Sequence, residues 1–135
     1  MNAKKENPAV AHNTTEIGGY DAVAYFTEGK PTRGNGHHVT VFDGVTYLFA
    51  SEDNKKKFDA NPRKYIPAYG GYCAFGVTEE KKFVADPEAW KIVDGKLYLN
   101  LDKDVQSEWE KDVSGNIRKA DNIWPRIMDT PASDL

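Results

Sequence analysis

The sequence of 135 residues contains a single cysteine, Cys73. One thiol cannot form an intramolecular disulfide, and it cannot by itself complete a structural zinc site, which needs four nitrogen or sulfur ligands. The lone cysteine also leaves the redox compartment open, because a disulfide framework is absent in either case. Cys73 is therefore either a small buried hydrophobic residue or a single soft ligand with thiol reactivity.

The sequence also lacks long apolar runs and a strong charge of either sign. No run approaches the about 20 apolar residues that a membrane-spanning helix needs. The formal net charge is -3, and an acidic chain gains nothing from releasing the counterions of a phosphate backbone, which argues against a nucleic-acid partner. The hydrophobic content of 39% is sufficient for the core of one compact domain.

The beginning of the sequence, Met1 to Pro8, has no apolar segment of the kind that signal peptides contain. This start is either native, which predicts a cytoplasmic protein, or a methionine placed before a mature exported chain. Residues 1–16 are polar and aperiodic, so we expect a flexible N-terminal arm. Residues 17–127 are expected to form a single domain, followed by a polar C-terminal tail over residues 128–135.

Two hairpins are predicted from the same turn signal. Asp43-Gly44 separates residues 38–42 from 45–49, and Asp94-Gly95 separates residues 90–93 from 96–101. An Asp-Gly pair favours a two-residue hairpin turn because both central positions require positive φ. Side chains alternate along a strand, so His38, Thr40 and Phe42 are expected on one face of the first hairpin.

Helix signals surround these hairpins. Ser51 is expected to cap a helix that ends near Asn61-Pro62. The cap-then-proline pattern of Asp86-Pro87 predicts a helical turn over residues 86–90. An amphipathic helix is expected from Asp102 or Asp104 to a break at Gly115, followed by a last short helix over residues 116–124. The predicted class is α+β: a small antiparallel sheet built from two hairpins, with helices packed against it.

Cys73 lies in the segment richest in glycine and aromatic residues, from Pro67 to Gly76. Gly70-Gly71 permits a sharp turn and a close approach of the backbone to a ligand. Aromatic side chains on both sides of the cysteine are suited to forming pocket walls. The predicted pocket residues are Tyr69, Gly70, Gly71, Tyr72 and Phe75, together with Tyr47 of the first hairpin.

Two adjacent histidines, His37 and His38, precede the first hairpin turn. Neighbouring side chains on a strand point to opposite faces, so at most one of the two can enter a given site. Thiolate and imidazole together suit soft and borderline metals such as copper. No hydrolase motif and no phosphate-binding glycine loop is present, which favours a non-catalytic protein.

Several long motifs resemble the bacterial YHS-domain family, in its stand-alone form. They are Gly19-Tyr20-Asp21-Ala22-Val23-Ala24-Tyr25-Phe26, Tyr47-Leu48-Phe49-Ala50-Ser51, Tyr69-Gly70-Gly71-Tyr72-Cys73-Ala74 and the stretch from Asp86 to Leu101. Related modules are attached to copper-transporting ATPases, so the resemblance implies binding of copper or another soft metal. Some members carry selenocysteine at the position that matches Cys73, which implies a functional thiol. Many stand-alone members are exported, which implies a periplasmic or secreted protein whose signal has been removed.

Two positions depart from the family pattern. Metal-binding relatives often have cysteine before the serine of the Tyr-x-Phe-x-Ser motif, where this sequence has Ala50. Ala22 stands where many members have proline. The missing second thiol argues against a tight site made by this chain alone, so a partner or a second copy could complete it.

Three hypotheses follow, and the first is preferred. In that hypothesis the protein is a small non-catalytic metal-binding protein, with Cys73 as thiolate ligand, His38 or else His37 as imidazole ligand, and copper(I) as the metal. Its partner is then the metal ion or a metal-handling protein. In the second hypothesis Cys73 is the reactive group of a thiol redox protein. In the third, the aromatic loop belongs to a structural or interaction module. The oligomeric state is left open.

Overall fold

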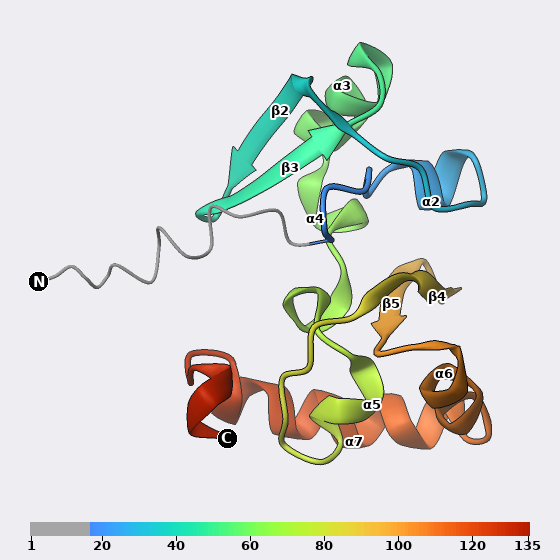
Figure 1. The fold of residues 1–135 in the computed structure, drawn as a ribbon, viewed down its shortest axis with the longest axis vertical. Coiled ribbons are helices and arrows are strands. Elements are labelled where there is room, and N and C mark those ends of the chain that lie inside the picture. Colours follow the sequence, from blue (N-terminus) through green and yellow to red (C-terminus); the bar gives the residue numbers. More distant parts are fainter. Residues whose placement is uncertain (1–16) are drawn as a thin grey trace, which may run out of the picture. The chain divides into compact units, whose positions relative to one another are not determined.

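The computed structural model describes residues 17–135, and Figure 1 shows their course. The predicted N-terminal arm therefore lies outside the described residues. The chain divides into two compact units, with the boundary between Tyr65 and Ile66. Each unit contains one antiparallel two-stranded sheet and several helices. The α+β class is thereby confirmed, but the two hairpins form separate sheets where one shared sheet was expected.

The first unit is built on the hairpin of β2 (Asn35–Phe42) and β3 (Val45–Phe49). Asp43 and Gly44 connect the strands with φ of 52° and 78°, which confirms the predicted turn. The register pairs Val39 with Leu48 and Val41 with Thr46, and it becomes irregular between Asn35 and Val39. This unit also contains the short helix α2 (Ala24–Thr27).

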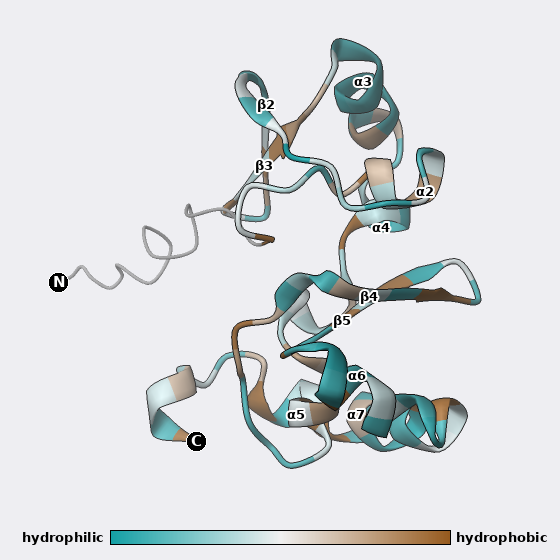
Figure 2. Cartoon of the chain, turned by 45° about the vertical axis from the view of Figure 1, so that its right-hand side comes forward, coloured by the Kyte–Doolittle hydropathy of each residue, from teal (hydrophilic) through white to brown (hydrophobic). Residues whose placement is uncertain are grey.

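Helix α3 (Glu52–Ala60) packs against this hairpin, and the short helix α4 (Pro62–Tyr65) follows. The Ser51 side chain accepts a hydrogen bond from the Asn54 N–H at 3.1 Å, as expected of an N-cap. Most of α3 is hydrophilic in Figure 2. The exception is Phe58, which is fully buried and contacts the rings of Tyr47 and Phe49 at centroid distances of 4.8 and 5.1 Å. One apolar residue thus joins the helix to the inner face of the hairpin.

The second unit contains the hairpin of β4 (Asp86–Val93) and β5 (Lys96–Asn100), with Asp94 and Gly95 in the turn at φ of 50° and 77°. The helical turn predicted over residues 86–90 was wrong, because these residues belong to β4. The Asp86 side chain does accept a backbone hydrogen bond, from the Glu88 N–H at 2.9 Å. This bond lies at an irregularity of the strand between Asp86 and Trp90, so the Asp-Pro pattern marks a bulge and not a helix start.

Two turns precede this hairpin, the 3-10 turn η1 (Ala68–Gly71) and the short helix α5 (Ala74–Val77). After the hairpin come α6 (Lys103–Glu110) and α7 (Val113–Ile127). The Asp102 side chain caps α6 through the Val105 N–H. The predicted break at Gly115 was wrong. The Asp112 side chain accepts from the Gly115 N–H at 3.1 Å, so this glycine lies in the first turn of α7. The helix then continues past Pro125 to Ile127.

The core of the second unit is aromatic and is formed largely by these helices with η1 and β5. Trp109 is completely buried, and its ring lies 5.6 Å from that of Tyr98. The core comprises Ala68, Tyr69, Ala74, Val77, Tyr98, Trp109, Ala120, Ile123 and Ile127. The chain ends in the 3-10 turn η2 (Ala132–Asp134), and Leu135 packs against this core. The last residue of the predicted polar tail is therefore in contact with the fold.

Candidate functional site

Cys73 stands between η1 and α5, at the end of a tightly turned segment. Tyr69, Gly70 and Gly71 have φ of 58°, 62° and 84°. The two glycines adopt this left-handed conformation without steric cost, which confirms the predicted sharp turn. Tyr69 does so against the preference of its Cβ, and sequence reasoning did not anticipate this. The turn delivers Cys73 to the N-cap position of α5.

The thiol of Cys73 is buried, with 1% of the residue exposed. Its Sγ accepts a hydrogen bond from the Gly76 N–H at 3.4 Å and lies 3.5 Å from Asn100 Oδ1. The Phe75 N–H donates to the same oxygen at 3.1 Å. That bond fixes the orientation of the Asn100 amide, so its acceptor oxygen faces the sulfur and the thiol donates to it.

Burial raises the pKa of the Cys73 thiol above its usual value, because the charged thiolate loses solvation. Backbone N–H groups, including that of Gly76, oppose this effect, and the negative charge of Asp102 adds to it. The resting state is therefore the protonated thiol. The exposed, low-pKa cysteine that a redox sensor requires is not the form present in this structure.

The predicted aromatic wall is packed into the fold of the second unit. Tyr69 lies 5.9 Å from the rings of both Tyr98 and Trp124, and the Tyr72 ring lies 6.4 Å from Trp124. The Tyr69 hydroxyl donates to Asp121 Oδ1 at 2.8 Å. Phe75 is partly buried and packs against the same core. These contacts give the aromatic residues a structural role, and their role as pocket walls stays a prediction.

Tyr47, the remaining predicted pocket residue, belongs to the first unit. It is 6% exposed and packs on Phe58 of α3. The structure therefore places it in the core of the unit that also carries both candidate histidines.

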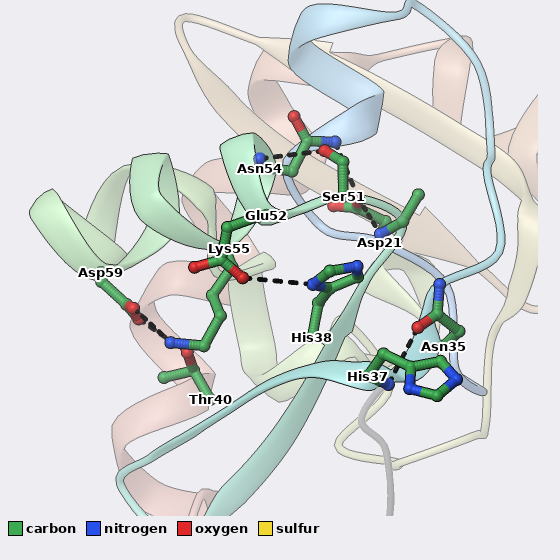
Figure 3. A network of polar contacts seen from close by, with 11 residues as sticks. Asp21, Asn35, His37, His38, Thr40, Ser51, Glu52, Asn54, Lys55 and Asp59 are labelled. Carbon is green, nitrogen blue, oxygen red and sulfur yellow. Dashed lines mark hydrogen bonds and ion pairs between the residues drawn. The ribbon is translucent and has the colours of Figure 1, made fainter.

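Of the two candidate histidines, only His38 faces α3. Its Nδ1 lies 3.2 Å from Glu52 Oε1, and 26% of its side chain is exposed. His37 is exposed, and its backbone N–H donates to the side chain of Asn35 at 2.9 Å. Figure 3 shows the two rings on different sides of β2. The structure thus confirms that adjacent strand positions send these side chains apart.

Cys73 and His38 belong to different compact units. Among residues 17–135, no group of three or more His, Cys, Asp or Glu side chains is arranged to hold a metal ion. The first unit supplies a histidine beside a carboxylate, and the second supplies a buried thiol. The pairing of the two as ligands stays a prediction.

Asp21 is a buried polar residue whose importance sequence reasoning underestimated. It is fully buried, and its Oδ1 accepts from the N–H groups of Val23 and Ala24 at 2.8 and 3.1 Å. Its Oδ2 accepts from the Ala50 N–H and from Asn54 Nδ2, both at 2.8 Å. Four neutral donors surround one carboxylate, which therefore ties together three segments of the first unit. In the sequence, Asp21 stands out only as part of the motif from Gly19 to Phe26.

Asn100 was missed in a different way. Because side chains alternate along a strand, Asn100 belongs to the face opposite Leu97 and Leu99, and the sequence pattern gives it no role there. Asparagine is depleted in β-strands, so its presence in this predicted strand was a signal that could have identified it. At 1% exposure, such a side chain needs hydrogen-bond partners, and Cys73 and Phe75 supply them.

A comparison with protein families finds a match that lies mainly in the first unit. Residues 23–69 match the model of the YHS domain. This part of the chain is therefore similar to the YHS domain, a domain to which metal binding is generally ascribed. The match includes His38 and Glu52 and ends four residues before Cys73. Neither the curated proteins nor the solved structures contain a match to this chain. No helix among the described residues is long and apolar enough to cross a membrane.

Proposed function

We propose that this protein binds a soft metal ion through the thiolate of Cys73, with the imidazole of His38 as co-ligand. Copper(I) is the preferred candidate. The observation that carries the proposal is the match of residues 23–69 to the YHS domain. Thiolate and imidazole are ligands that copper(I) accepts, and a site with few protein ligands suits an ion that is passed on to another protein. The protein then acts as a carrier and not as an enzyme.

The surroundings of Cys73 support a ligand role once the proton has left. The Gly76 N–H already points at the sulfur, and a backbone donor of this kind stabilises a thiolate. Asn100 Oδ1 holds the proton in the resting state. A metal ion therefore replaces the thiol proton, so binding releases a proton and strengthens as the pH rises.

Access to Cys73 requires a local opening of the chain. The Cys73 N–H donates to the Phe83 carbonyl at 2.9 Å. The Phe83 ring packs on Gly76, where an added Cβ would lie 2.8 Å from Phe83 Cδ2. Phe83 itself is 41% exposed. We propose that movement of Phe83 gives access to the sulfur, because local openings of this kind cost less than global unfolding.

Thiol redox chemistry at Cys73 is the alternative. Burial and a raised thiol pKa both slow the attack of a thiolate on a peroxide or a disulfide. Metal binding tolerates the same properties, because the ion itself displaces the proton. The geometry therefore favours the metal-binding role.

The test is a titration of the reduced protein with copper(I) against a chromogenic chelator. Wild type should withdraw about one equivalent of copper, and Cys73→Ser should withdraw none. His38→Ala should bind about 10 to 100 times more weakly, whereas the matched control His37→Ala should behave as wild type. A wild type that leaves all copper with the chelator, or a Cys73→Ser variant that competes equally well, would overturn the proposal.

A further inference from the structure

Among residues 17–135, His38 and Glu52 form a histidine–carboxylate contact, with Nδ1 and Oε1 3.2 Å apart. A carboxylate can only accept hydrogen bonds. The hydrogen of this contact must therefore lie on His38 Nδ1. When the imidazole is neutral, its lone pair is then on Nε2. Figure 3 shows the second ring nitrogen on the side of the ring away from Glu52.

This arrangement reverses the preference of a free histidine. An imidazole in water favours the tautomer with its proton on Nε2, which leaves Nδ1 as the metal-binding nitrogen. Nδ1 lies next to the backbone, where an approaching ion meets β2. Nε2 lies at the tip of a side chain that is 26% exposed. The carboxylate thus leaves the lone pair on Nε2, the ring nitrogen farther from the backbone.

The residues before and after Glu52 in the sequence hold it in position. Ser51, directly before it, caps α3 through the Asn54 N–H. The Asn54 side chain is in turn bound to the buried carboxylate of Asp21. Glu52 is the first residue of α3, where the helix dipole favours a negative charge. The backbone of Glu52 is therefore held in place at the capped start of α3.

Strand β2 is held against α3 by two further contacts. Thr40 Oγ1 donates to Asp59 Oδ1 at 2.6 Å, and the Phe42 ring lies 6.1 Å from that of Phe58. His38, Thr40 and Phe42 alternate along one face of β2, so all three meet the same helix. Three contacts in a row hold the face of the strand that carries the histidine.

Lys55, a cation close to Glu52 along α3, is engaged elsewhere. Lys55 lies three residues after Glu52 on α3, a spacing that permits an ion pair. Its Nζ instead pairs with Asp59 Oδ2 at 2.9 Å, and Figure 3 shows this pair on the side of Thr40. The Lys55 ammonium is therefore paired with Asp59, and the Glu52 carboxylate contacts His38.

We infer that Glu52 is a positioning residue that keeps the proton of neutral His38 on Nδ1 and presents Nε2 to a soft or borderline metal ion. The metal part of this inference rests on the proposed function, whereas the tautomer does not. Carboxylates that hold the second ring nitrogen of a metal-binding histidine orient the ring and raise its basicity. Glu52 acts through His38 and does not itself touch the ion.

The first test is a long-range proton–nitrogen NMR spectrum of the metal-free protein at a pH of about 8.5, where histidine is neutral. His38 should carry its proton on Nδ1 in wild type and on Nε2 in Glu52→Ala. Glu52→Gln, whose amide oxygen still accepts, should give an intermediate spectrum. Asp53→Ala is the matched control, since it removes an exposed acid from the same helical turn, and it should leave the His38 signals unchanged. An Nε2–H tautomer in wild type would overturn the inference.

The second test measures copper(I) affinity in the same variants. Glu52→Ala should bind about 10 to 100 times more weakly than Asp53→Ala. Equal affinities of the two variants would refute the positioning role even if the tautomer is as stated. If wild type binds no copper at all, the proposed function fails, and the NMR result still decides the tautomer by itself.

Discussion

At the scale of single residues, Cys73 is a buried thiol whose proton is held by an asparagine. Asn100 Oδ1 faces the sulfur because the Phe75 N–H fixes the amide. Nothing in the spacing of the sequence connects residue 73 with residue 100. The segment from Pro67 to Gly76 suggests a reactive thiol in the sequence, but in the folded protein its thiol is buried and protonated.

Alkylation of Cys73 by iodoacetamide should be slow in the folded protein and fast in urea. An opening that costs about 3 kcal/mol slows the reaction about a hundredfold. The raised pKa adds to this, because less thiolate is present at a given pH. The pH profile of the folded protein should accordingly lie to the alkaline side of the profile in urea. Equal rates in both states at pH 8 would contradict the buried thiol.

The same shift gives the sign of a contribution to stability. The thiol pKa is raised on folding above its ordinary value of 9.0, so the folded state favours the protonated form. This contribution is fully present below that pH and is lost as the pH rises through the pKa of the folded protein. Cys73→Ser should therefore flatten the alkaline limb of the stability curve relative to wild type.

At the scale of elements, the first unit is held by one buried carboxylate. Asp21 accepts hydrogen bonds from the beginning of α2, from the residue after β3 and from α3. Such a residue joins elements that the hydrophobic pattern alone leaves separate. Its four partners distinguish it from the other aspartates of the sequence.

Asp21→Asn should destabilise the first unit by about 2 to 4 kcal/mol. The amide replaces one acceptor oxygen with a donor, so two buried donors lose their partner at about 1 to 3 kcal/mol each before relaxation. Hydrogen exchange measured by mass spectrometry should show the loss of protection in residues 17–65. Asp53→Asn, an exposed neighbour in the first turn of α3, should change stability by about 0.5 kcal/mol or less. Equal protection in the two variants would contradict the role given to Asp21.

Much of the element structure could be predicted because it depends on short-range signals. Asp43-Gly44 and Asp94-Gly95 determine their turns locally, and Ser51 and Asp102 cap the helices that follow them. The errors arose where one local signal admits two structures. Asp86-Pro87 serves a strand bulge instead of a helix start, and Gly115 lies inside a helix because Asp112 caps it. The Cys73–Asn100 and His38–Glu52 contacts depend on tertiary packing, which the sequence pattern does not contain.

At the scale of the whole molecule, the chain consists of two compact units that meet along the sequence at Tyr65. The YHS match includes nearly all the described residues of the first unit and only the first few of the second. The two proposed ligands are divided in the same way, with His38 in the first unit and Cys73 in the second. A second thiol at Ala50 would have placed two potential ligands in the first unit.

All three tryptophans, Trp90, Trp109 and Trp124, belong to the second unit. Tryptophan fluorescence therefore reports on that unit, where Trp109 is completely buried. We expect Asp21→Asn to leave the urea midpoint of the fluorescence transition unchanged while hydrogen exchange in the first unit increases. If the fluorescence midpoint and the hydrogen exchange of the first unit report the same loss of unfolding free energy, the two units unfold as one.

The proposed function requires that one copper(I) ion be bound through the Cys73 thiolate, with the His38 imidazole as co-ligand. The most informative measurement is X-ray absorption at the copper edge of the loaded and desalted protein. We expect one copper per chain with a sulfur and a nitrogen ligand, the sulfur absent in Cys73→Ser and the nitrogen absent in His38→Ala. A desalted protein without copper, or a coordination shell without sulfur, would contradict it.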